Sequence, residues 1–142
     1  MGYELYHYDR QSKKECDFKK EIVSCDIDEE KVSKVEELYG IEAPDMLKRM
    51  ITMCTDDTKN MVANKRVNLI RILSFDELMH PEKRFGAEFK SQGFVAVADC
   101  LNNDSLGYDV NMEKWVWRSN EGQRNVYMKD KDVISIICCI DE

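Results

Sequence analysis

Cysteine and histidine are the first side chains to consider as nucleophiles, bases or metal ligands, and this sequence has six cysteines and two histidines. The two histidines, His7 and His80, are far apart, and no Cys-x-x-Cys pair occurs. His80 directly precedes Pro81, where an imidazole suits the C-terminal end of a helix. Since free thiols in apolar runs behave as small hydrophobic groups, we expect structural cysteines at Cys16, Cys25, Cys54, Cys100, Cys138 and Cys139.

Motifs for other chemistry are missing as well. The sequence has no glycine-rich phosphate loop, nucleophile elbow, zincin helix or EF-hand pattern. Its adjacent carboxylates, at 36–37 and 56–57, are of a kind that is usually solvated. We therefore expect no enzyme: no catalytic residue, no metal and no cofactor. The enzymatic alternative is a small cysteine- or metal-dependent enzyme with a Cys–His pair assembled in the fold.

The acidic side chains are unevenly distributed. Within a formal net charge of −7, residues 26–60 hold ten acidic and five basic side chains, and residues 99–113 hold four acidic and no basic ones. Two interpretations remain open: a solvated rim, or a negative surface that speeds encounter with a basic partner. Under the second, we expect the partner-binding residues to be Asp56, Asp57, Asn102, Asn103, Asp104, Asp109 and Trp117.

Trp117 has two interpretations of its own. Trp115 and Trp117 flank Val116, so on a strand both point to one face. That face belongs to the core, or an exposed tryptophan on it anchors an interface. Under the acidic-surface hypothesis, Asp104→Lys is expected to weaken binding without lowering the melting temperature.

Length and charge exclude several classes of protein. A chain of 142 residues fits one domain. Its negative charge disfavours direct nucleic-acid binding, because phosphates attract Lys and Arg. The densest apolar run, residues 134–140, is far shorter than the roughly 20 residues of a membrane span. Since the N-terminal residues lack the apolar segment of a secretory signal, we expect a cytoplasmic location.

The elements that must position these residues change type along the chain. Helical apolar spacing occurs over 28–40, where Val32, Val35, Leu38 and Tyr39 repeat and Gly40 ends the pattern, and over 44–54. Beyond residue 65 the pattern predicts short strands, at 67–73, 94–98, 106–110, 115–117 and 123–128. One Ser-capped helix is predicted between the first two strands, at 74–80, and Pro81 ends it.

The two ends of the chain are less regular in pattern. Residues 1–25 are expected to form a strand or a packed arm beside a domain of residues 26–142. Residues 133–140 suit a final helix or a strand equally. The sequence predicts a single α+β domain, with N-terminal helices packed on a mainly antiparallel meander sheet.

This order of elements resembles the SUKH superfamily. The step Tyr39-Gly40-Ile41 before Pro44, and the Ser74-capped helix after a strand, are similar to the family's opening and to its strand-helix unit. The stretches 94–99, 106–110 and 115–117 resemble its next strands, so the resemblance covers roughly residues 26–142. Two departures are Ala43, where the family usually has Leu, and the Asn-Asn-Asp turn at 102–104, where it often has a Gly-rich turn.

The resemblance implies a non-enzymatic protein-binding module. Family members include bacterial immunity proteins, which neutralise a toxin encoded beside them, and fungal regulators of cell-wall synthesis. We expect an immunity protein, a monomer or weak homodimer, whose partner is a basic toxin domain, for example a nuclease. The alternative is a housekeeping scaffold or regulator that binds an endogenous protein.

Overall fold

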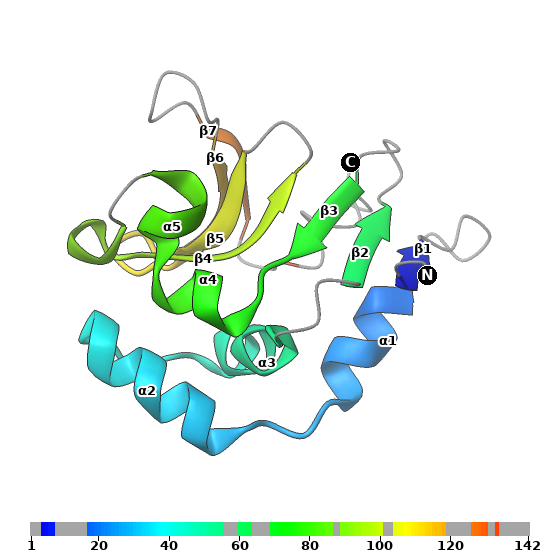
Figure 1. Ribbon diagram of the computed structural model, residues 1–142, viewed down its shortest axis with the longest axis horizontal. Helices are drawn as coiled ribbons and strands as arrows, with labels where there is room; N and C mark the ends of the chain where they lie inside the picture. The colour runs from blue at the N-terminus through cyan, green and yellow to red at the C-terminus, as the bar shows by residue number, and fades with distance from the viewer. Residues whose placement is uncertain are drawn as a thin grey trace.

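A seven-stranded sheet organises the protein, and its strands lie side by side in the order of the chain (Figure 1). The computed structural model describes residues 4–7, 17–55, 60–63, 69–86, 89–100, 104–118, 126–130 and 133. The first strand, β1, runs parallel to β2, and every later neighbour is antiparallel. The strands are β1 (Glu4–His7), β2 (Asn60–Ala63), β3 (Leu69–Ile72), β4 (Phe94–Cys100), β5 (Ser105–Asp109), β6 (Lys114–Arg118) and β7 (Val126–Asp130).

Helices occupy the first half of the chain and the step between β3 and β4. Figure 1 shows α1, α2 and α3 along one side of the molecule, with α4 between α3 and the sheet. The helices are α1 (Asp17–Ser24), α2 (Glu29–Tyr39), α3 (Asp45–Met53), α4 (Phe75–Met79), α5 (Pro81–Phe85) and the 3₁₀ helix η1 (Lys90–Gln92). The α+β fold with a mainly antiparallel meander sheet is therefore confirmed.

Both ends of α2 are capped, and Gly40 ends the helix as predicted. The Asp28 side chain accepts a hydrogen bond from Lys31 N at 3.2 Å, and Gly40 ends the helix in the left-handed conformation at φ 69°. Of the four residues with helical spacing, Val32, Val35 and Tyr39 are buried. Leu38 is 39% exposed, because it lies beyond the edge of the apolar stripe.

The second predicted helix and the Ser-capped helix are also present. In α3 and at its C-cap, Cys54, all four side chains of the apolar repeat are fully buried: Leu47, Met50, Ile51 and Cys54. At α4, Ser74 and Glu77 form a complete capping box. Pro81 differs from expectation, since it begins α5 as well as following α4. A proline suits a first helical turn because it has no N–H to satisfy.

The N-terminal arm contains both a strand and a helix. Strand β1 pairs with β2, which the sequence analysis did not predict. Helix α1 is attached to α3 through Arg49, whose Nη1 donates to Val23 O at 3.0 Å and Cys25 O at 3.1 Å. These carbonyls at a helix C-terminus have no partner within the helix. The predicted final element at 133–140 lies outside the described residues, apart from the buried Val133.

The central strands bring their backbones into close contact at Gly107. Gly107 of β5 pairs with Ala96 of β4, next to a register shift between Ala96 and Ala98. A Cβ at Gly107 would lie against Val95 O and only 2.8 Å from Ala96 Cα. Backbone atoms cannot move aside as a flexible side chain can, so only glycine fits here.

We expect Gly107→Ala to destabilise the fold by about 3 kcal/mol through this overpacking. Gly86→Ala is the control, since φ is +69° there and no atom lies within 4 Å of a new Cβ. It should cost about 1 kcal/mol, the usual penalty for a left-handed alanine. Urea unfolding of both variants measures the difference, and equal losses would contradict the close contact.

Candidate protein-binding surface

The expected partner-binding residues do not form an exposed acidic surface in the described part of the chain. Asp56, Asp57, Asn102 and Asn103 lie outside the described residues. The other three are described and buried: Asp104 is 3% exposed, Trp117 6% and Asp109 7%. The expectation that these three side chains contact a partner is therefore corrected, because each faces the interior.

Asp104 and Trp117 are partners of each other. The indole Nε1 of Trp117 donates a hydrogen bond to Asp104 Oδ2 at 3.2 Å. The strand pairing sets Trp117 beside Leu106 on the same face of the sheet, and both residues belong to the hydrophobic core. Of the two interpretations of Trp117, the structure supports the core. A buried carboxylate needs such partners to offset its loss of water.

Asp109 stabilises the turn between β5 and β6. Its Oδ1 accepts a hydrogen bond from Met112 N at 3.0 Å, and its Oδ2 lies 3.7 Å from Arg118 Nη2. The Arg118 guanidinium also lies over the Phe94 ring, 3.9 Å from its centroid. Asp109 is thus used within the fold, and in residues 99–113 only Glu113 is an exposed acidic side chain among those the structure describes.

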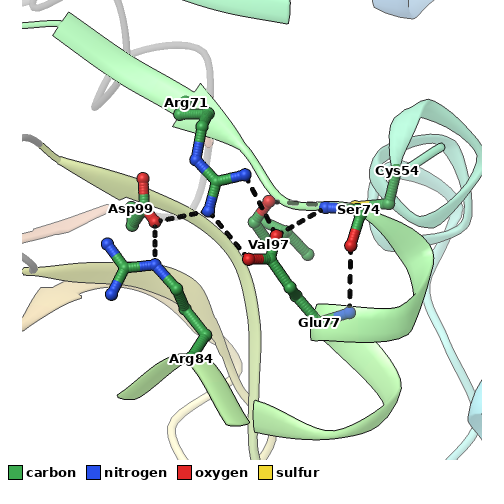
Figure 2. A network of polar contacts seen from close by, with 7 residues as sticks. All are labelled: Cys54, Arg71, Ser74, Glu77, Arg84, Val97 and Asp99. Carbon is green, nitrogen blue, oxygen red and sulfur yellow. Dashed lines mark hydrogen bonds and ion pairs between the residues drawn. The ribbon is translucent and has the colours of Figure 1, made fainter. Parts of the chain in front are cut away.

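Asp99 is the centre of an ion-pair network between the sheet and the α4–α5 segment (Figure 2). Its Oδ2 accepts hydrogen bonds from Arg71 Nη2 on the neighbouring strand at 2.9 Å and from Arg84 Nε on α5 at 2.6 Å. The Asp99 side chain is 4% exposed. Arg71 is also bound by both carboxylate oxygens of Glu77, at 3.0 Å each.

The charges of this network balance internally. Two guanidinium groups, from Arg71 and Arg84, face two carboxylates, from Asp99 and Glu77. Burial by itself raises the pKa of Glu77, but the hydrogen bonds from Arg71 and from Ser74 N outweigh it, so the pKa is lowered and the ionised form is favoured. Such a network holds elements together and leaves no net charge for a ligand.

The largest group of exposed acidic side chains in the described residues lies instead on α2, its two flanking loops and the first residue of α3. We define the acidic α2 surface by the exposed carboxylates of residues 26–45, where Lys34 is the one exposed base: Asp26, Asp28, Glu29, Glu30, Glu37, Glu42 and Asp45. The sequence analysis counted this excess but assigned contacts only to 56–57. Helical spacing could have found it, because 29, 30, 33 and 37 lie opposite the buried stripe.

Two of the described thiol and imidazole groups, those of Cys54 and His80, have structural surroundings. Cys54 is fully buried and its Sγ lies 3.8 Å from Val97 O (Figure 2). Burial raises the pKa of this thiol to about 12, so it stays protonated at neutral pH. His80 caps the C-terminus of α4, as expected, with Nδ1 3.6 Å from Glu82. Within the described ranges, no three His, Cys, Asp or Glu side chains are grouped to hold a metal ion.

No helix in the described residues is long and apolar enough to cross a membrane. No protein-family model, curated protein or solved structure matches the chain.

The burial of Asp104 reverses the sequence-based expectation for Asp104→Lys. A lysine there loses the bond to Trp117 and places an unpaired cation in the interior, so we expect a loss of about 3 kcal/mol. Glu42→Lys, the same charge change at an exposed position, should stay within about 0.5 kcal/mol of wild type. Thermal melting measures both variants, and an unchanged Asp104→Lys would contradict the buried pair.

The ion-pair network gives a second prediction. Asp99→Asn removes the charge shared by Arg71 and Arg84, and we expect it to cost about 3 kcal/mol. Asp76→Asn is its control. Asp76 Oδ2 lies 3.5 Å from Lys83 Nζ, and both side chains are 59% exposed. Such an exposed ion pair contributes about 0–1 kcal/mol to the free energy of unfolding. Denaturant unfolding distinguishes the two. If Asp99→Asn lowers the free energy of unfolding no more than Asp76→Asn does, the ion-pair network does not stabilise the fold.

Proposed function

We propose that this protein is a non-enzymatic, immunity-type binding module. In this role it binds a basic toxin domain encoded beside it and neutralises that toxin by covering its active region. The acidic α2 surface is the part of the described structure that faces the partner. It replaces the contact residues expected from the sequence, three of which are buried.

The order of the elements carries this proposal. The sequence resemblance implies a helix, a Tyr-Gly-Ile step, a second helix, a strand, a Ser-capped helix and three further strands. In the chain, α2 is followed by Tyr39-Gly40-Ile41, α3, β3, α4 with its Ser74 cap, and then β4, β5 and β6, with β2, α5 and η1 as additions. The helices and strands of the chain occur in the order that the resemblance implies, which supports the resemblance. The resemblance in turn implies a protein-binding module.

The charge of the exposed surface supports a basic partner. The acidic α2 surface presents seven carboxylates and one exposed base over residues 26–45. An excess of one sign accelerates the encounter with an oppositely charged protein and rejects acidic competitors. A toxin nuclease has a basic cleft because it must bind phosphates, so a negative surface can block it.

Co-expression tests the function directly. The C-terminal domain of the protein encoded immediately upstream is produced in bacteria with and without this chain, and growth is measured. We expect growth to be restored only by co-expression, and the two proteins to co-purify at a one-to-one ratio. Continued toxicity and no complex would overturn the proposal. Binding to an unrelated endogenous protein instead would indicate a housekeeping scaffold.

The role of charge is tested at Glu37. Glu37→Lys reverses one exposed charge in the last turns of α2, where a lysine suits the helix dipole, so stability should be unchanged. We expect the association rate with the toxin domain to fall about 3- to 10-fold at low salt and the difference to vanish at about 1 M salt. Glu82→Lys, an equal change on α5, is the control. Stopped-flow rates that are equal for both variants would contradict an acidic contact surface.

A further inference from the structure

We infer that the partner docks on one end of the molecule, which we call the α2–η1–turn surface: Leu38 and the C-terminal end of α2, η1, and residues 110–113 between β5 and β6. Leu38 and Met112 are its apolar anchors. The inference rests on the proposed function and deepens it by naming where a basic protein binds. None of the residues expected from the sequence belongs to this surface.

The three segments meet although they are far apart in the chain. Helix α2 contacts η1. The turn is attached to the C-terminal end of η1, since Asn111 Nδ2 donates to Gln92 O at 3.3 Å and Val110 N donates to Gly93 O at 2.8 Å. In Figure 1 the end of α2, η1 and the β5–β6 turn lie at the same end of the molecule, away from α1.

This end exposes large apolar side chains. In the described part of the chain three large hydrophobic residues are exposed: Val23 at 50%, Met112 at 40% and Leu38 at 39%. A single exposed apolar residue is ordinary. Two of the three, however, lie on segments that flank η1, and flexible methionine adapts well to a partner's surface. Apolar anchors surrounded by polar groups are typical of binding hot spots.

The turn that presents Met112 is held in a strained conformation. Glu113 has φ 54°, the one non-glycine residue with positive φ in the described ranges. Such a backbone costs of order 1 kcal/mol and persists only where its surroundings fix it. Here Asp109 Oδ1 accepts from Met112 N at 3.0 Å, and Asn111 is attached to η1. The anchor is thus ordered before binding, which reduces the entropy that binding costs.

The charges around the anchors define the partner's chemistry. Glu37, Glu42 and Glu113 are exposed, and the basic side chains near them are Lys34, which is exposed one helical turn before Leu38, and the half-buried Lys90 and Lys114. The α2–η1–turn surface also adjoins the acidic α2 surface, because both include the C-terminal end of α2. Since the acidic α2 surface has seven exposed carboxylates and one exposed base, carboxylates exceed bases over the two surfaces together. The α2–η1–turn surface therefore complements a folded protein that offers an apolar depression bordered by Lys and Arg. Phosphates of nucleic acid or anionic lipid would be repelled.

The test compares three serine variants in binding to the purified toxin domain. We expect Leu38→Ser and Met112→Ser each to raise the dissociation constant about 10-fold, which is the loss of affinity typical of truncating an anchor. Val23→Ser, on α1, is the matched control and should stay within about 2-fold. Titration calorimetry measures affinity, and melting curves establish that all three variants remain folded. In hydrogen exchange, binding should protect residues 36–40 and 108–113 more than α1.

Any other result overturns the inference. The measurements also distinguish a wrong docking surface from a wrong proposed function. If wild type binds the toxin domain while Leu38→Ser and Met112→Ser bind as tightly, the partner docks elsewhere and the proposed function stands. The same holds if exchange protection falls on α1. If wild type binds no toxin domain, both the proposed function and the docking surface are wrong.

Discussion

The Asp99 carboxylate lies between two guanidinium groups, Arg71 on β3 and Arg84 on α5, and is almost completely buried. A buried charge is tolerated only when its partners replace the lost water. Glu77 completes the arrangement, because it binds Arg71 and also caps α4 through Ser74. One set of four charges therefore holds β3, β4, α4 and α5 together. Each of the two helices is too short to be stable alone.

The same constraint explains why a count of acidic residues misplaced the binding surface. Asp99, Asp104 and Asp109 occur in a stretch without a single basic side chain, which suggests an exposed negative strip. Asp99 and Asp104 nevertheless meet donors from other elements, namely Arg71 and Arg84 for Asp99 and the Trp117 indole for Asp104. Asp109 is bound by the Met112 amide in its own turn and lies 3.7 Å from Arg118 on β6. The buried acids therefore contribute little to the protein's external field.

The excess of negative charge that reaches solvent belongs to α2 and its flanking loops, outside the core stripe of Val32, Val35 and Tyr39. The helix is held on its inner side, where Tyr39 Oη donates to Leu78 O at 2.8 Å. Its outer side carries carboxylates, Ser33, Lys34 and Leu38. A rigid helix that presents charge, next to a fixed turn that presents Met112, combines fast encounter with ordered contact.

The sequence by itself determined the local elements: the Asp28 cap and Gly40 end of α2, the fully buried repeat from Leu47 to Cys54, and the capping box at Ser74, because these depend on residues within a few positions of one another. It also predicted the antiparallel strands other than β2, but not the helices α1, α5 and η1. Only the tertiary structure decided which acids are buried. Arg84 reaches Asp99, and Trp117 reaches Asp104, across distances in the chain that no spacing rule specifies, and burial depends on those long-range contacts.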